Sequence, residues 1–200
     1  MGMAADYAAA AAGRRDGPQF IWVPAAPAAG EGAAVAREAR YGGRVSYSVR
    51  EAVAGEEETV LPLYEWLFAE PGTRPDGWDR EWAAEALRLA IEGPQSAVFV
   101  AREGGEPGFL GFATAYIDLP SVRYGTRCWV EDLAVDPDRR SAGIGGLLLD
   151  AAERWAGGMG ATHLELDTGV ARVEARRFYE SRSPAAQCVS YQWSLDPRGS

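Results

Sequence analysis

The sequence predicts an α/β (α+β) domain of three layers, in which helices cover both faces of a central sheet. Segments that alternate apolar and polar residues, as strands do, recur between segments with the 3.6-residue period of helices. Apolar residues make up 47% of the 200 residues, which is enough for the buried core of one domain. Strands and helices mixed in this way indicate a sheet packed between helices.

The domain is expected to open with a strand and two helices. Alternation through Val45, Tyr47 and Val49 predicts a strand over residues 44–50. Thr59 is expected to cap a helix that runs to about Phe68, with Pro62 tolerated in the first turn. Asp79 is expected to cap a second helix that ends at Gly93-Pro94. Its apolar stripe consists of Trp82, Ala83, Ala86, Leu87, Ala90 and Ile91.

The middle of the chain reads as a hairpin, a strand and a long helix. Strands are predicted over 96–102 and 109–117, joined around Gly104-Gly105, and a further strand over 127–135. A helix opens near Gly143 and closes at Gly157-Gly158. One face of this helix carries Ile144, Leu147, Leu148, Ala151, Ala152 and Trp155.

Three elements complete the domain. An alternating strand is expected over 162–168, a short helix over about Val173 to Ser181, and a last strand over 187–195. Residues 1–40 precede the domain as an Ala/Pro-rich extension with fifteen alanines and no sustained period, so the folded domain is expected over 41–200. Shielding of a substrate cleft and formation of a homodimer are both compatible with such an extension.

Composition excludes several classes of function. The net charge is −9 and every basic residue is an arginine, so the basic footprint of a nucleic-acid binder is absent. A Walker A phosphate loop needs a lysine and is excluded as well. The sequence has no run of eighteen apolar residues and no secretory signal, which predicts a cytoplasmic protein without a membrane partner. An acidic surface instead favours cationic partners.

Cysteine and histidine offer little for metal binding or nucleophilic catalysis. Cys128 and Cys188 are expected to be two small buried apolar residues. His163 is the one histidine, and it stands in a strand pattern. A metal site or a Ser-His-Asp triad would have to be built around it alone, so no metal is expected.

The most informative stretch joins the strand that ends at Val135 to the helix that opens near Gly143. Glycines at a helix start let the backbone approach a ligand, and the free N–H groups of the first turn attract a diphosphate. Arg139 and Arg140 add charge. A Rossmann fingerprint would need a third glycine at Leu148 and a place at the start of the fold. An ordinary turn remains the alternative.

The segment Arg140-Ser-Ala-Gly143-Ile-Gly145 resembles the Arg/Gln-x-x-Gly-x-Gly/Ala signature of the GNAT acyltransferases. In that family the backbone amides of this loop hold the pyrophosphate of acetyl-CoA, which here implies Arg140, Ser141, Ala142, Gly143, Ile144, Gly145 and Gly146. The strand before the loop resembles the family's fourth strand, which splays from its neighbour in a mixed sheet and pairs with pantetheine. The resemblance therefore also implies Leu133, Ala134 and Val135 as cofactor contacts.

Two positions depart from the family pattern. The segment Ala175 to Glu180 is similar to the family's Ala-x-x-Phe-Tyr segment, but Arg172 stands where the family often has an asparagine that contacts pantetheine. Ser183-Pro184 replaces the usual Gly-Phe after the helix. Arg172 is still expected to contact the cofactor.

Glu131 is the candidate general base. A protonated alkylamine must lose a proton before it attacks a thioester, and a carboxylate can take that proton. Glu131 and Asp132 lie in the middle of a strand, where alternation is expected to point them to opposite faces. The diamine and spermidine acetyltransferases have a similar aromatic-x-Glu-Asp-Leu/Ile-x-Val strand. Ordinary polar residues on an edge strand are the alternative interpretation.

Tyr179 is the candidate general acid. It shares one helix face with Ala175 and Phe178, so a core aromatic is the alternative. The family has a tyrosine near the sulfur of CoA at the matching position. The acceptor site implied by the resemblance offers Trp66, Glu70, Asp76, Trp78, Trp82 and Tyr116, whose rings and acids suit a cationic amine.

The sequence thus predicts an acetyl-CoA-dependent N-acetyltransferase that acts on a primary amine of a small, polyamine-like cation. An aminoglycoside or a protein amine as acceptor, and a non-catalytic acyl-CoA-binding module, stay open as alternatives.

Overall fold

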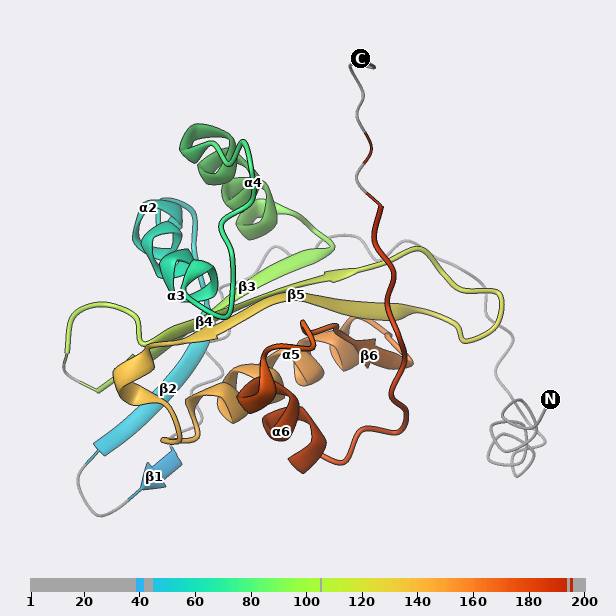
Figure 1. Ribbon diagram of the computed structural model, residues 1–200. Coiled ribbons are helices and arrows are strands. Elements are labelled where there is room, and N and C mark those ends of the chain that lie inside the picture. Colours follow the sequence, from blue (N-terminus) through green and yellow to red (C-terminus); the bar gives the residue numbers. More distant parts are fainter. Residues whose placement is uncertain (1–38, 42–44, 105, 194, 196–200) are drawn as a thin grey trace. The chain divides into compact units, whose positions relative to one another are not determined.

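The computed structural model describes residues 39–41, 45–104, 106–193 and 195 (Figure 1). Most of the predicted 1–40 extension lies outside this range. The first described strand, β1 (Ala39–Tyr41), pairs with β2 (Val45–Glu51), so Ala39 and Arg40 belong to the sheet and not to the extension.

A mixed sheet forms the centre of the domain, as predicted. The described strands follow one another in sheet order from β1 to β6. The other strands are β3 (Ser96–Glu103), β4 (Gly111–Ile117), β5 (Arg127–Val135) and β6 (His163–Glu165). Neighbours up to β5 are antiparallel, although β2 and β3 are joined by the helical segment 52–95, whereas β6 runs parallel to β5 after a helical crossover.

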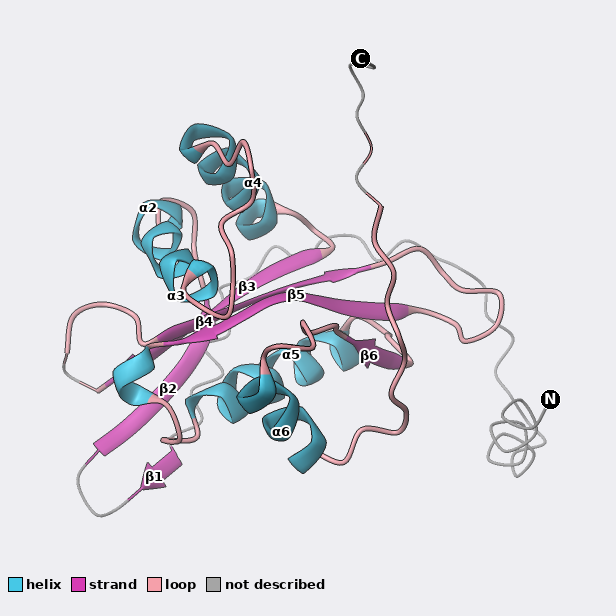
Figure 2. Cartoon of the chain, viewed as in Figure 1, coloured by secondary structure: helices cyan, strands magenta, loops and turns pink. Residues whose placement is uncertain are grey.

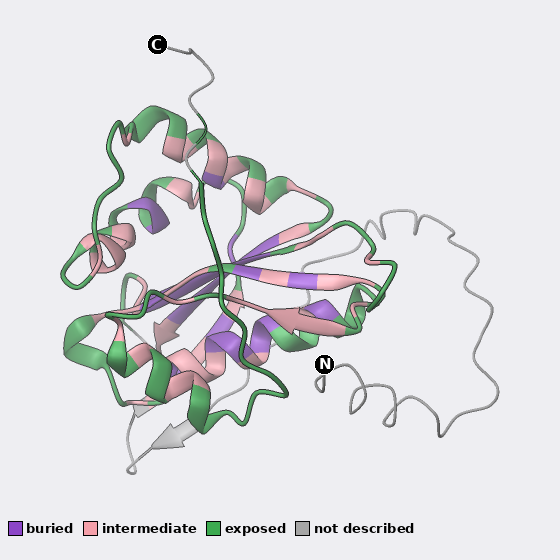
Figure 3. Cartoon of the chain, turned by 45° about the vertical axis from the view of Figure 1, so that its right-hand side comes forward, coloured by how far each residue is buried: buried purple, intermediate pink, exposed green. Residues whose placement is uncertain are grey.

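Helices cover both faces of this sheet (Figure 2). One face carries α2 (Glu57–Val60), the 3-10 segment η1 (Leu61–Tyr64), α3 (Glu65–Phe68) and α4 (Arg80–Glu92). The other face carries α5 (Ile144–Gly158) and α6 (Val173–Ser181). Two buried clusters result, one around Phe112 and Val100 under the first helices and one around Leu148 and Ile144 under α5 (Figure 3).

Several predicted boundaries are confirmed because local chemistry determines them. The Asp79 carboxylate accepts a hydrogen bond from the Trp82 amide at 2.8 Å and caps α4, and Gly93 ends that helix. Strand β5 and helix α6 have the bounds that their patterns predict. The three-layer α/β architecture is thereby confirmed.

The helix predicted from Thr59 is wrong in detail. Helical structure begins two residues earlier at Glu57, and Pro62 converts the middle of the segment into a 3-10 turn. Proline lacks the N–H that an α-helix needs at that position and clashes with the preceding turn. Trp82, which was assigned to the apolar stripe of α4, is 71% exposed.

The C-terminal part differs most from the prediction. The strand expected over 162–168 is only three residues long, and residues 187–193 form no strand. Val189, Tyr191 and Trp193 are exposed, as is Cys188, which was expected to be buried. A strand needs a partner that supplies hydrogen bonds, and alternation alone does not provide one.

Candidate functional site

The candidate site lies where strands β5 and β6 part. The two strands pair only over three residues, from Arg127 opposite His163 to Trp129 opposite Glu165. Strand β5 continues to Val135, whereas β6 ends. Among the described residues, no strand therefore lies beside the outer edge of β5 from Val130 onward (Figure 1). Leu133, Ala134 and Val135 lie along this open edge.

A bulge in β5 changes how its two carboxylates point. The register between β4 and β5 shifts at Thr114 and Ala115, so that Thr114 pairs with Asp132 and Ala115 with Val130. Glu131 is thus the extra residue. Val130 and Leu133 both pack in the cluster under α5, three positions apart. The expectation that Glu131 and Asp132 point to opposite faces is therefore wrong, because strict alternation is broken between them.

The Asp132 carboxylate is held by two hydroxyl groups. The Tyr64 hydroxyl donates to Asp132 Oδ2 at 2.8 Å, and the Thr114 hydroxyl donates to the same oxygen at 3.2 Å. The Asp132 amide in turn donates to Thr114 Oγ1 at 3.1 Å. Burial nevertheless raises the pKa of Asp132, although the hydrogen bonds from Tyr64 and Thr114 act against that rise.

Glu131 and Tyr179 share one electrostatic neighbour, Asp167. Desolvation, then repulsion from Asp132 and from Asp167, raises the pKa of the Glu131 carboxyl, while the Trp129 side chain acts to lower it. Burial raises the pKa of Tyr179 to about 12, with Arg172 opposing the rise and Asp167 adding to it. Asp167 thus acts on both groups. The two residues predicted to act as base and acid both lie within range of Asp167.

Arg172 ties the two helical layers together at this site. Its guanidinium donates to the Leu67 carbonyl at 2.7 Å, which links the start of α6 to α3. A Cβ placed on Gly72 would lie 1.9 Å from that same carbonyl and 2.5 Å from Arg172 Nη2. The close packing therefore requires glycine at position 72. In the structure the Arg172 side chain binds protein backbone beside the predicted cofactor edge.

The loop before α5 has the backbone form of an anion site. Pro137–Arg139 forms a 3-10 turn that the Asp136 carboxylate caps through the Asp138 amide. Ser141 and Gly143 then adopt positive φ angles of 63° and 82°, and α5 begins at Ile144. Positive φ at Gly143 suits a residue without a side chain.

The amides of this loop have no partner within the described residues. Leu147 is the first amide of α5 that donates, to the Gly143 carbonyl, so those from Ser141 to Gly146 remain available. Arg139 lies 3.4 Å from Glu103 and Arg140 lies 3.8 Å from Glu174, both longer than a close hydrogen bond. Free amides, the positive end of a 15-residue helix and two loosely paired arginines fit a diphosphate.

Three residues at the site escaped the sequence analysis. Tyr64 and Thr114 contact Asp132 from elements 68 and 18 positions away in sequence, so no local pattern connects them. Asp167 lies two residues beyond the end of the short strand β6. The carboxyl end of a parallel strand is a frequent place for functional side chains, and that signal would have found it.

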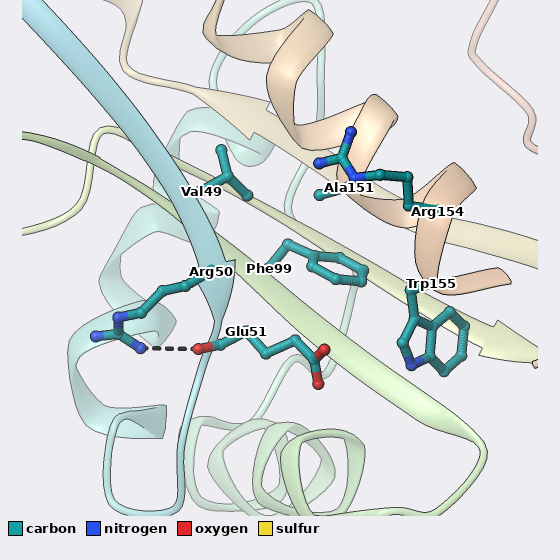
Figure 4. A pocket seen from close by; sticks show the side chains of 7 residues that line it. All are labelled: Val49, Arg50, Glu51, Phe99, Ala151, Arg154 and Trp155. Atoms are coloured by element: carbon teal, nitrogen blue, oxygen red, sulfur yellow. Dashed lines mark hydrogen bonds between the residues drawn. The ribbon is translucent and has the colours of Figure 1, made fainter. Parts of the chain in front are cut away.

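A shallow pocket on the α5 face lies apart from this site (Figure 4). It has a volume of about 140 Å³ and is lined by Val49, Arg50, Glu51, Phe99, Ala151, Arg154 and Trp155. The residues from α5 lie in its middle and second half, which a rise of about 1.5 Å per residue places roughly 10 to 16 Å from the loop at its start. Phe99 and Trp155 form its apolar wall, and Arg50 points away from it.

Other titratable groups form no second reactive centre in the part of the chain that the structure describes. His163 lies 3.2 Å from Glu165 and packs against Tyr124. No group of three or more His, Cys, Asp or Glu side chains there is arranged to hold a metal ion, and none of the helices in that part is long and apolar enough to cross a membrane.

Replacing Asp132 by asparagine tests the electrostatic description of the site. The pKa of Asp132 is higher in the folded protein than in the unfolded chain, so the protonated carboxyl stabilises the fold at pH values below the unfolded-state pKa of about 3.9. This stabilisation is lost as the pH rises through the pKa that Asp132 has in the folded protein. We expect Asp132→Asn to have a larger free energy of unfolding than the parent protein at pH 7. The difference should shrink on acidification, with a slope of at most about 1.4 kcal/mol per pH unit.

Urea unfolding from pH 4 to pH 8 measures this difference. Asp76→Asn, in an exposed loop, is the matched control and should show no such trend. A lower stability of Asp132→Asn at pH 7 would mean that the hydrogen bonds from Tyr64 and Thr114 outweigh the cost of burying the charge.

Comparison with known proteins agrees with this geometry. A family model described as the acetyltransferase (GNAT) family matches residues 60–183. An uncharacterized N-acetyltransferase, YhfO, of Bacillus subtilis (strain 168) is 32% identical over 136 residues, which are 66% of this chain and 86% of that protein. A second protein of the same organism, the uncharacterized N-acetyltransferase YhdJ, is 37% identical over 62 residues, 31% of this chain and 44% of YhdJ.

Solved structures share the fold at lower sequence identity. The aminoglycoside N-acetyltransferase AAC(6')-Iy in complex with CoA has a TM-score of 0.63 and 17% identity, covering 78% of this chain and all of that one. Glucosamine-6-phosphate N-acetyltransferase from Arabidopsis thaliana has a TM-score of 0.60 and 18% identity, and the match covers 75% of this chain and 99% of that one. Because the family model matches more than half of the chain, the chain belongs to the acetyltransferase (GNAT) family and is an acyltransferase.

Proposed function

We propose that this protein transfers the acetyl group of acetyl-CoA to a primary amine of a small, polyamine-like cation. The observation that carries the proposal is the grouping of acidic side chains at the open edge of β5. Glu131 and Asp132 lie on β5 itself, and the charge of Asp167 acts on both Glu131 and Tyr179. Three carboxylates close together attract a cationic amine, and the amide-lined loop before α5 supplies the site for a diphosphate.

The cofactor contacts are assigned to two neighbouring backbone segments. The amides of Ser141 to Gly146, together with Arg140, are proposed to hold the diphosphate. The open edge of β5 at Leu133, Ala134 and Val135 is proposed to pair with the pantetheine arm, because backbone groups on an unpaired edge still need partners. Arg172 is proposed to lie beside that arm while it holds the Leu67 carbonyl.

Glu131 is proposed as the base. An alkylamine with a pKa of about 10 is protonated at pH 7, and removing its proton costs roughly 4 kcal/mol. Desolvation raises the pKa of the Glu131 carboxyl, which makes its carboxylate a stronger proton acceptor than that of an ordinary exposed glutamate. Acetyl-CoA supplies the thioester carbonyl that the freed amine attacks. The new C–N bond replaces the C–S bond.

Tyr179 is proposed as the acid for the departing thiolate. Its pKa of about 12 keeps the hydroxyl protonated throughout the neutral range, so it can donate to a developing negative charge. Arg172 lies close enough to lower that pKa and would stabilise the tyrosinate after proton transfer.

Direct attack by the amine is favoured over an acyl-cysteine. Cys128 is fully buried, and burial raises the pKa of its thiol to about 11, so it stays a neutral thiol at pH 7. Cys188 is exposed in the C-terminal segment that follows α6. The direct route needs only the groups assigned above.

The acceptor class is tested by measuring thiol release from acetyl-CoA with a panel of amines. The panel contains polyamines, simple monoamines, aminoglycosides and peptides with free amino groups. The proposal predicts the highest kcat/KM with a polyamine. A preference for an aminoglycoside or a peptide would support the acetyltransferase activity but contradict the proposed polyamine-like substrate. No thiol release with any amine would favour a non-catalytic acyl-CoA-binding module.

Gly145→Asp tests the diphosphate loop. Acetyl-CoA at one hundred times its Kd should stabilise the parent protein by about 2.7 kcal/mol. A side chain at position 145 meets only ordinary contacts, with Phe178 at 3.6 Å, and an acid in the first turn suits the helix dipole. We therefore expect the variant to fold but to lose the thermal shift, because its charge repels the phosphates.

The control for this variant is Gly157→Asp at the other end of α5, where no atom lies within 4 Å of an added Cβ. It should keep the thermal shift in a melting experiment with acetyl-CoA. An unchanged shift in Gly145→Asp would remove the diphosphate assignment.

Glu131→Gln tests the base. The change conserves shape, so fold and acetyl-CoA affinity should stay the same while kcat falls roughly a hundredfold or more. In the parent protein, activity should fall on acidification through the raised pKa of Glu131, and this acidic limb should disappear in the variant. Glu81→Gln, on exposed α4, is the control in the pH–rate measurement. Normal turnover in Glu131→Gln would mean that another group is the general base, and Asp132 would be the next residue to test.

Tyr179→Phe tests the acid. The ring keeps its packing against Phe178, whose centroid lies 5.1 Å away, and only the hydroxyl is lost. Turnover should slow by about a hundredfold with little change in KM for acetyl-CoA, the pattern of a contact made mainly in the transition state. Steady-state kinetics of Tyr47→Phe, at a buried tyrosine of β2, provide the comparison. Equal rates in both variants would make Tyr179 a packing residue.

A further inference from the structure

Arg74 lies in a cluster of aromatic and acidic side chains between α3 and α4. Its guanidinium carbon is 4.8 Å from the centre of the Trp78 ring and 5.2 Å from that of Phe68. The two rings stand at 75° to each other with centroids 5.7 Å apart, so they form two walls of a corner. The Glu65 carboxylate pairs with the guanidinium at 2.5 Å.

This arrangement has the chemistry of a site for an organic cation. Two aromatic faces and one carboxylate around a positive charge are what recognition of ammonium and guanidinium groups requires. The chain's own arginine demonstrates that the corner accepts such a group.

The corner also connects to the carboxylates at the β5 edge. The Phe68 ring lies 6.2 Å from the Tyr64 ring, and the Tyr64 hydroxyl binds Asp132, the neighbour of Glu131. Arg172 holds the carbonyl of Leu67, directly before Phe68, against the start of α6. The corner is therefore anchored to the same elements as the proposed acceptor site.

We propose that Glu65, Phe68 and Trp78 form a cage for a second positive charge of the acceptor, and that Arg74 is the resident occupant which the acceptor displaces. This inference rests on the proposed function. It narrows the substrate class to primary amines that carry another ammonium or guanidinium group on the same molecule. One charge is held at Glu131 for reaction, and the other enters the cage.

Arg74 is held weakly enough to leave. The side chains of Arg74 and Glu65 are 47% and 57% exposed, so water screens their attraction. An exposed cation–π contact or an exposed ion pair favours the bound position by a factor of only about two to five. Arg74 also lies in the loop that joins α3 to α4, whose residues 73–77 are all exposed, so its side chain has room outside the cage.

A binding experiment with a doubly charged probe tests the cage without depending on catalysis. The probe is 1,4-bis(trimethylammonio)butane, which has two permanent charges and no N–H to acetylate. Calorimetry on the full chain should show that Arg74→Gln binds it roughly tenfold more tightly than the parent protein, because the competitor is gone. Arg88→Gln is the charge-matched control, since Arg88 is 38% exposed and pairs with Glu85 and Glu92 on α4.

The cage walls are tested in the Arg74→Gln background. Trp78→Leu should abolish the gain in affinity, whereas Trp78→Phe should keep most of it because an aromatic face remains. Thermal unfolding shows which variants are folded, and Glu65→Gln, at an exposed position, replaces Trp78→Leu if that variant unfolds. Equal affinity of Arg74→Gln and Arg88→Gln would overturn the cage, because the gain would then reflect net charge alone.

The acetylation panel separates the two proposals. If no amine is acetylated but the probe binds as expected, the proposed function fails and the cage remains a cation site. If amines are acetylated but Arg74→Gln binds the probe no more tightly than Arg88→Gln, the enzyme assignment remains and the cage is wrong. If amines are acetylated and Arg74→Gln also binds the probe more tightly than Arg88→Gln does, Arg74→Gln should lower the KM for a diamine more than the KM for a monoamine of equal length.

Discussion

The parting of β5 and β6 is the constraint on which the rest of the site depends. The two strands pair for three residues and then separate, so β5 runs on to Val135 with one edge unpaired. Backbone groups on such an edge remain available to a ligand instead of a neighbouring strand. The same divergence leaves space for Asp167 and for α6, which carries Tyr179.

The bulge at Glu131 adds a second consequence to this divergence. By breaking alternation, it leaves Val130 and Leu133 packed under α5 and turns the two intervening carboxyl groups away from that core. Asp132 then meets Tyr64 and Thr114, and Glu131 stays close enough to Asp132 to be affected by its charge. Like charges in a partly desolvated place cost stability, and such groupings occur where a protein uses them for chemistry.

Positive charge is distributed to match these acids. Arg139 and Arg140 flank the amide loop, Arg172 bridges α6 to α3, and Arg74 fills the corner formed by Phe68 and Trp78. Arg139 and Arg140 are paired over long distances and Arg74 through exposed contacts, whereas Arg172 makes a short, partly buried hydrogen bond to the Leu67 carbonyl. This acidic chain without lysine thus has guanidinium groups beside the loop proposed to bind an anionic cofactor, and one in the corner where a cationic acceptor is proposed to replace it.

The sequence by itself determined the three-layer architecture, the cap at Asp79, the extent of β5 and α6, and the helix start that carries glycines, because these features depend on local chemistry. Periodicity, capping and backbone φ involve only near neighbours in the chain. The proposed roles of Glu131 and Tyr179 come from such local patterns together with the resemblance of their segments to a known family. Only the tertiary structure decided that β6 stops at Glu165, that Val189, Tyr191 and Trp193 stay exposed, and that Tyr64 binds Asp132. Strand length, register and the pairing of distant side chains depend on a partner elsewhere in the chain, and no local pattern contains that partner.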